Sequence, residues 1–165
     1  PRELSLGGNH RVSMKPAKEV TALRGSYYPT CAFNLNSQKV VMVRDAEAVE
    51  VQLVWDLRLS TAEQFGMELG DGLRVFVDNQ AQRLVVERRY PDYSLEGTRS
   101  IPLPTDSKLS LRIFIDSSSV EVFVNDGDAC LSSRIYPQVG QRDISLFAHH
   151  GVASLQDGGY WSLDK

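Results

Sequence analysis

The chain has 165 residues, of which 42% are apolar and 24% charged, and its formal net charge is −3. These fractions are typical of a globular protein, and a chain of this length buries roughly 70% of its unfolded surface in one domain. The acidic balance argues against a nucleic-acid partner or an anionic membrane, because both attract a basic patch.

No apolar run approaches the roughly 18 residues of a membrane span, and no signal peptide is recognisable. The two cysteines, Cys31 and Cys130, form neither a disulfide framework nor a CxxC metal motif. We therefore expect reduced thiols, a cytoplasmic protein and one domain over residues 1–165.

Residues 1–38 differ in pattern from the rest of the chain. They contain two turn-like clusters, Gly7–Gly8 and Tyr28–Pro29, and one helical candidate at residues 16–24. Pro16 can occupy the first turn of a helix, and apolar residues follow it at helical spacing. The sequence predicts at most this one short helix.

From about residue 39 onward, apolar residues alternate with polar ones, as in half-buried strands. In residues 49–57 the odd positions are apolar, whereas Glu50, Gln52 and Asp56 fall on the other face. Turn signals at Asp71–Gly72 and Asp78–Asn79 separate the next strands. The pattern predicts an antiparallel meander that ends at Pro102 and Pro104, because proline cannot donate to a central ladder.

Residues 109–136 predict a three-stranded meander. The odd residues 109–115 and the even residues 120–124 must share one face, which requires pairs such as Ile113 with Val122. Ser117–Ser118 fits a two-residue turn, and Asp126–Gly127 fits a type I′ turn. The second turn pairs Val122 with Leu131 and Phe123 with Cys130.

Two phenylalanines, Phe114 and Phe123, fall on the nominally solvent-facing side of this meander. Such a face either packs against a second element of the domain or forms an interface. We favour burial within the domain.

Many short strands, little helix and frequent turns predict an all-β fold. The architecture that we expect is a β-sandwich of two antiparallel sheets, and a barrel is the alternative.

The chemical motifs that we tested fail. The loop after Asn125 lacks the later glutamate of a calcium-binding EF-hand. The adjacent His149 and His150 would point to opposite faces of a strand, so a turn explains them better than a metal site. Ser117, Ser118 and Ser119 lack a nucleophile elbow. We predict no metal, no cofactor and no catalytic residue in this chain.

Paired carboxylates for glycoside cleavage cannot be assigned, because the sequence does not bring two acids to the ~5 Å of a retaining mechanism. The candidate acids are Glu19, Asp45, Glu50, Asp56, Glu68, Asp116 and Glu121. Trp55 is in register with the core valines, so we predict that it is a core residue. The other candidate aromatic platforms for a sugar are Tyr27, Tyr28, Tyr160 and Trp161.

Several segments together resemble one family. These are "PRELSL" (1–6), "KPAKEVTALR" (15–24), "FGMEL" (65–69), "SSVEVFVNDGDACLSSRIYP" (118–137) and "WSL" (161–163). They are similar to the C-terminal module of glycoside hydrolase family 32, which includes invertases, sucrose-6-phosphate hydrolases and other β-fructofuranosidases. The resemblance implies a β-sandwich that follows a five-bladed catalytic β-propeller.

The resemblance also implies that catalysis belongs to the propeller. The family's nucleophile, transition-state stabiliser and acid/base lie in Asn-Asp-Pro-Asn, Arg-Asp-Pro and Glu-Cys motifs, and none of these motifs occurs here. The chain alone should therefore be inactive, and its parent should hydrolyse a β-fructofuranosyl bond with retention. We expect the sandwich to pack on the propeller through a junction at residues 1–6, with Arg2, Glu3 and Leu4 in the interface.

Two other functions remain open: a carbohydrate-binding module for fructose-containing sugars, and a module for homo-oligomerisation. The sequence does not distinguish sucrose, sucrose 6-phosphate and fructan as the parent's substrate.

Overall fold

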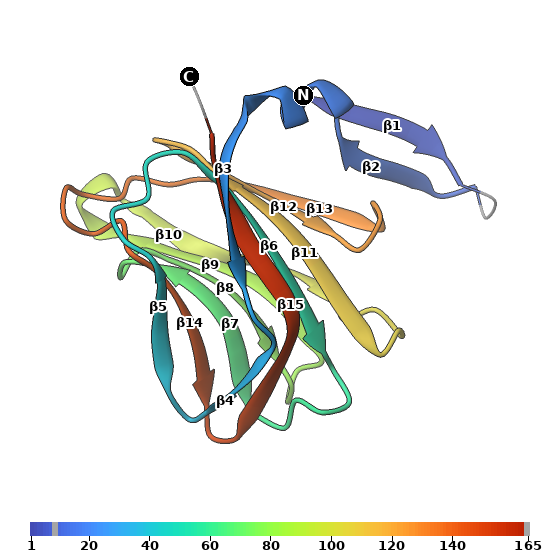
Figure 1. The fold of residues 1–165 in the computed structure, drawn as a ribbon, viewed down its shortest axis with the longest axis vertical. Helices are drawn as coiled ribbons and strands as arrows, with labels where there is room; N and C mark the ends of the chain where they lie inside the picture. Colours follow the sequence, from blue (N-terminus) through green and yellow to red (C-terminus); the bar gives the residue numbers. More distant parts are fainter. Residues whose placement is uncertain (8–9, 164–165) are drawn as a thin grey trace.

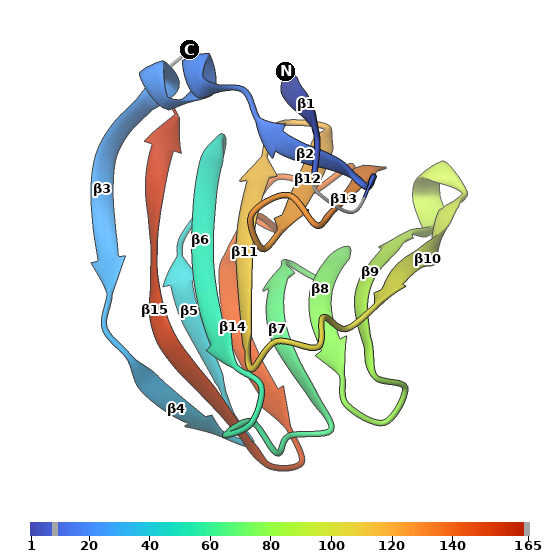
Figure 2. The same cartoon turned by 90° about the vertical axis from the view of Figure 1, so that its right-hand side faces the viewer.

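The structure, a computed structural model, describes residues 1–7 and 10–163, so Gly8 of the predicted Gly7–Gly8 turn lies outside it. Two antiparallel sheets face one another in two layers (Figures 1 and 2). The all-β sandwich that the sequence predicts is confirmed. No helix in the described residues is long and apolar enough to cross a membrane.

One sheet has six strands in the order β10-β9-β8-β7-β14-β5. Their bounds are β5 Lys39–Val43, β7 Gln64–Leu69, β8 Leu73–Asp78, β9 Arg83–Tyr90, β10 Leu95–Pro102 and β14 Ile144–His149. Strand β10 is an edge strand and ends at Pro102, where the sequence predicted the end of the meander.

The other sheet has seven strands, in the order β13-β12-β11-β6-β15-β3, with β4 also paired to β15. Their bounds are β3 Arg24–Thr30, β4 Phe33–Asn36, β6 Val49–Asp56, β11 Lys108–Ile115, β12 Ser119–Val124, β13 Ala129–Arg134 and β15 Val152–Leu163. A separate two-stranded sheet joins β1 (Arg2–Leu6) to β2 (Val12–Pro16).

The core lies between the two large sheets, where the alternating apolar side chains of both layers meet. The predicted core residue Trp55 is fully buried, and its ring meets the edge of Phe65 at a centroid distance of 5.3 Å. Leu111 and Ile113 of β11 and Val122 of β12 are also buried. Burial of this kind contributes about 25 cal/mol per Å² of apolar surface.

The register predicted for the 109–136 meander is confirmed. Ile113 pairs with Val122, Val122 with Leu131, and Phe123 with Cys130. The backbone N–H of Asp116 donates to the carbonyl of Ser119 at 3.0 Å, which closes the first turn around Ser117–Ser118.

The type I′ turn predicted at Asp126–Gly127 is wrong in its conformation. Positive φ angles fall on Asn125 (50°) and Gly127 (98°), and Asp126 does not have one. The reason is local bonding: Asn125 exchanges hydrogen bonds with the backbone of Ser110, and its amide also donates to Asp128. These bonds hold Asn125 in the left-handed region that asparagine tolerates.

The N-terminal quarter is more regular than its sequence indicates. The predicted helix shortens to a 3₁₀ helix, η1 (Lys18–Leu23), and a second 3₁₀ turn, η2, spans Pro91–Tyr93. The turn predicted at Tyr28–Pro29 is wrong, because both residues lie within β3. Strand β3 is an edge strand, where a proline need not donate to a ladder.

Candidate functional site

The N-terminal hairpin, which we define as β1 with β2, touches the sandwich along one side. Met14 donates its backbone N–H to the carbonyl of Gly127 at 3.1 Å. The Ser13 hydroxyl donates to the carbonyl of Asp126 at 3.3 Å, and Lys15 Nζ lies 2.5 Å from Asp126 Oδ2. The hairpin is thus held at the β12–β13 turn and projects beyond both large sheets (Figure 1).

Glycine is required at the point where the hairpin meets this turn. A Cβ atom on Gly127 would come within 2.3 Å of Ser13 Oγ and 3.0 Å of Lys15 Cγ. The positive φ of Gly127 also disfavours any side chain there. The local sequence therefore serves the docking of β2 as well as the turn itself.

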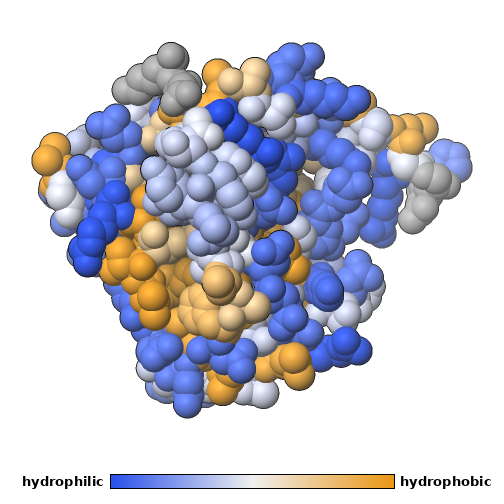
Figure 3. Space-filling view, viewed as in Figure 1, coloured by the Kyte–Doolittle hydropathy of each residue, from blue (hydrophilic) through white to orange (hydrophobic). Residues whose placement is uncertain are grey.

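One face of the hairpin is apolar and exposed. Leu4 and Leu6 alternate along β1, and Val12 pairs with Leu6, so the three share a face. Their exposed fractions are 68%, 70% and 54%. A lone two-stranded sheet is marginally stable, and neighbouring exposed leucines form an apolar patch of the kind that interaction sites use. A small apolar area marks this end of the hairpin in Figure 3.

The three predicted junction residues behave differently. Arg2 turns toward the sandwich: its Nε lies 3.2 Å from Glu121 Oε1, and its guanidinium also contacts Ser132. The hydrogen bond with Glu121 raises the pKa of Arg2. Glu3 accepts a 3.5 Å hydrogen bond from the backbone of Lys18, and Leu4 faces outward.

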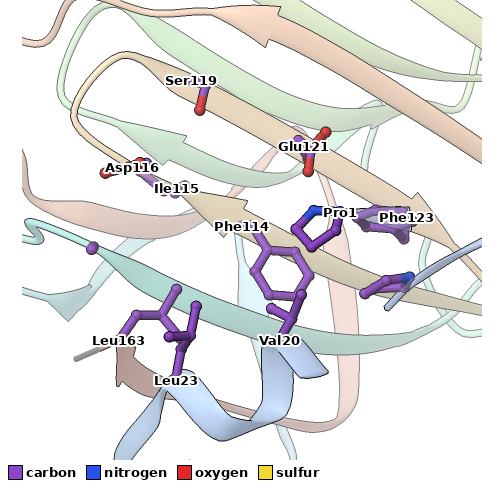
Figure 4. Close-up of a pocket in the computed structure, with 12 residues that line it drawn as sticks. Pro1, Val20, Leu23, Phe114, Ile115, Asp116, Ser119, Glu121, Phe123 and Leu163 are labelled. Atoms are coloured by element: carbon purple, nitrogen blue, oxygen red, sulfur yellow. The ribbon is translucent and has the colours of Figure 1, made fainter. Parts of the chain in front are cut away.

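A groove separates the hairpin and η1 from the outer face, by which we mean the side of the seven-stranded sheet that points away from the core. It has a volume of about 370 Å³. In Figure 4, Phe114 lies opposite Val20 and Pro1, and Glu121 borders them. Other lining residues are Pro16, Leu23, Ala48, Phe123 and Leu163.

The two predicted outer-face phenylalanines are buried to different extents. Phe123 is 2% exposed and lies beneath the Arg2 guanidinium, 5.8 Å from it, so it is buried within the domain. Phe114 meets the edge of Phe123 at a centroid distance of 5.8 Å, is only half-buried and lines the groove. Burial within the domain, which we expected for both, is thus complete only for Phe123.

Glu50 occupies a buried ion cluster on the outer face, which the sequence did not indicate. It is fully buried and pairs with two arginines. Arg24 donates to both carboxylate oxygens, at 2.8 and 2.7 Å, and Arg112 Nε donates at 2.8 Å. Arg24 also lies 3.8 Å from the centroid of Trp161. Burial alone would raise the pKa of Glu50, but the two arginines outweigh it and hold this pKa below its ordinary value.

Three of the other candidate acids form hydrogen bonds or ion pairs within the fold. Asp56 Oδ1 accepts hydrogen bonds from two backbone amides in the turn after β6. Glu68 pairs with Lys39, and Glu121 pairs with Arg2. Within residues 1–7 and 10–163, no three His, Cys, Asp or Glu side chains gather in a way that could hold a metal ion.

The predicted aromatic candidates lie along the β3–β15 pair. The ring of Tyr27 lies tilted by 30° against that of Trp161 at a centroid distance of 4.5 Å, and Tyr28 stacks on Tyr160 at 4.7 Å. Both β3 tyrosines are about half exposed. They pair across strands of one sheet, so they are brought together as two cross-strand pairs.

A second exposed apolar area lies along β5, the edge strand of the six-stranded sheet, and is visible in Figure 3. It includes Val40 and Val41, which are 41% and 40% exposed. An exposed apolar edge strand can pair with another chain, so this edge is the place where self-association would begin.

The fold and its surfaces define a class: a β-sandwich module with an apolar N-terminal extension. Residues 19–162 match the family model described as "Glycosyl hydrolases family 32 C terminal". The chain therefore belongs to this family, as the sequence resemblance predicted. The matched region begins after the N-terminal hairpin.

The curated relatives are longer than this chain. It is 51% identical to a sucrose-6-phosphate hydrolase of Escherichia coli over 98% of this chain and 34% of that protein. It is 47% identical to a raffinose invertase of Escherichia coli over 99% of this chain and 34% of that protein. The chain thus spans about a third of the length of these relatives.

Solved structures confirm the fold. The exo-inulinase of Aspergillus awamori superimposes with a TM-score of 0.83 at 20% identity, over 99% of this chain and 35% of that one. The sucrose-6-phosphate hydrolase of Lactobacillus gasseri gives 0.70 at 23% identity, over 99% and 33%.

Proposed function

We propose that this chain is the non-catalytic C-terminal sandwich of a β-fructofuranosidase, and that it packs on and stabilises the catalytic domain of the same polypeptide. The observation that carries the proposal is the N-terminal hairpin. Its apolar face has no cover among the described residues, while relatives that match the whole chain are about three times longer. In this proposal the upstream domain covers the apolar face of the hairpin.

The hairpin also lies where such a contact is expected. It precedes Glu19, the first residue that the family model matches, and it projects from the sandwich (Figure 1). Its outer face offers Leu4, Leu6 and Val12. Arg2 supports the contact indirectly, because it fastens the start of β1 to Glu121.

We further propose that the parent hydrolyses a β-fructofuranosyl bond. The relatives are named for sucrose 6-phosphate, raffinose and levan, which are all fructose-containing substrates. The sequence of this chain contains none of the family's catalytic motifs. We therefore propose a structural role for it. Both cysteines are free thiols, which suits a reducing cytoplasm.

Reconstitution from two pieces tests this proposal. The upstream domain and the 165-residue chain would be produced separately, mixed, and followed by sedimentation and by sucrose hydrolysis. We expect a 1:1 complex and higher activity or thermal stability than the upstream domain has alone. Leu4→Asp should weaken the complex, whereas Val139→Asp, at a fully exposed site outside the hairpin, should not. Absence of a complex, or equal effects of both variants, would contradict the proposal.

A further inference from the structure

We propose that a pocket built around Tyr90, Tyr93 and Tyr136 binds one neutral sugar ring. The pocket is distinct from the groove beside the hairpin and from the β3–β15 aromatic pairs. It lies where the Gly70–Gly72 turn, η2 and the segment that follows β13 meet, and its volume is about 320 Å³. That is the lower end of the range of small-molecule sites, which suits a single ring.

The pocket contains an aromatic platform. Tyr93 stacks on Tyr136 with a centroid distance of 4.6 Å and an angle of 28°, and Tyr93 is 57% exposed. Tyr93 belongs to η2, a tight turn in which Ser94 donates its backbone N–H to the carbonyl of Pro91 and which joins β9 to β10 (Figure 2). The negative face of such a ring attracts the weakly positive C–H groups of a sugar.

The inner end of the pocket holds a hydrogen-bond donor without an acceptor. Tyr90 is 7% exposed, and the O–H of its buried hydroxyl has no acceptor in the described part of the chain. Burial raises the pKa of Tyr90 to about 12, against smaller lowering effects of Arg142 and the nearby Tyr136 backbone. A buried donor is ordinarily satisfied, so an oxygen of a bound ligand is the natural acceptor for this O–H.

The backbone is shaped to leave room for this phenol. A Cβ atom on Gly72 would lie 2.2 Å from Tyr90 Cε1 and 2.9 Å from its hydroxyl oxygen. Tyr90 also meets the edge of Tyr136 at 6.3 Å and 82°, so the platform and the inner tyrosine form one packed unit.

The polar lining suits a sugar that carries no charge. Gln138 Nε2 donates to Asp92 Oδ2 at 3.0 Å, and Asp71 and Arg89 border the same space. Carboxylate, amide and guanidinium groups together can both accept from and donate to neighbouring hydroxyls. Arg89 already pairs with Glu87, so the two aspartates would repel a phosphate.

The test is a titration of the 165-residue chain with sucrose and, separately, with fructose 6-phosphate, followed by NMR chemical shifts. Single-ring contacts give weak binding, so we expect a Kd for sucrose of about 1 mM. Fructose 6-phosphate should bind at least tenfold more weakly. No shift change with sucrose, or equal binding of the phosphate, would overturn the proposal.

Three variants locate the site. Tyr93→Ala should weaken sucrose binding at least tenfold. Tyr90→Phe should weaken it severalfold without lowering the melting temperature, because it removes an unpartnered hydroxyl and keeps the ring. Tyr28→Ala is the matched control, since Tyr28 is a half-exposed, stacked tyrosine elsewhere. Loss of binding in Tyr28→Ala with none in Tyr93→Ala would place the sugar on β3 and overturn the proposal.

Discussion

The sandwich and the N-terminal hairpin are stabilised in opposite ways. Each large sheet of the sandwich buries its inner face against the other, and residues such as Leu53 and Ile113 are fully buried. The two strands of the hairpin pair with each other, rest on the Asn125–Asp128 turn and expose Leu4 and Leu6. The sandwich therefore buries its apolar faces within the chain, whereas the hairpin leaves apolar side chains exposed.

The largest expected effect lies in the sandwich, at Glu50. Glu50→Gln should lower the free energy of unfolding by about 3–5 kcal/mol, because Arg24 and Arg112 would lose their buried counter-charge. Denaturant unfolding of the 165-residue chain measures this change. Glu96→Gln, at an exposed site on β10, is the control and should change stability by less than about 0.5 kcal/mol.

The same residue predicts a pH dependence. The folded-state pKa of Glu50 is lower than its unfolded value, so the pairing contributes fully above the ordinary glutamate pKa of 4.5. This contribution is lost as the pH falls through the folded value. The stability gap between wild type and Glu50→Gln should therefore narrow below pH 4.5, and a gap that widens there would contradict this account of the cluster.

An intermediate effect is expected where the two regions meet, at Gly127. Gly127→Ala forces a Cβ against Ser13 and strains a left-handed residue, which costs about 1–3 kcal/mol. The hairpin should separate from the turn, and Lys15 should lose Asp126, while the core strands keep their protection. Amide exchange of Met14 would report this, and unchanged protection there would show that the contact does not hold the hairpin.

The smallest effect on the stability of the isolated chain is expected in the hairpin itself. Leu4→Asp in the isolated 165-residue chain should change stability by less than about 0.5 kcal/mol, because Leu4 is already exposed. In the full-length polypeptide the same substitution should be clearly destabilising. Similar small effects in both contexts would mean that no domain covers Leu4.

Much of the sandwich was predictable because its strands obey simple rules. Alternation placed Trp55 and Leu111 in the core, and the requirement for a shared face gave the pairing of Ile113 with Val122. These features depend on residues near one another in sequence, or on whether a strand position is odd or even. Both can be read from one sequence.

The candidate sites were less predictable because they depend on distant residues. Glu50 was placed on the polar face, but its burial depends on Arg24 and Arg112, which lie 26 and 62 residues away. The tyrosine pocket joins three separate turns, and no sequence pattern links Tyr93 to Tyr136. The junction at residues 1–6 was predicted from resemblance, whereas its strand pairing was not.

Hydrogen exchange of the hairpin amides tests the central claim most directly. It would be measured for residues 2–6 in the 165-residue chain and again in the full-length polypeptide under the same conditions. If the upstream domain covers the hairpin, exchange at Leu4 and Leu6 should slow at least tenfold in the full-length protein. Equal exchange in both would contradict docking through this hairpin.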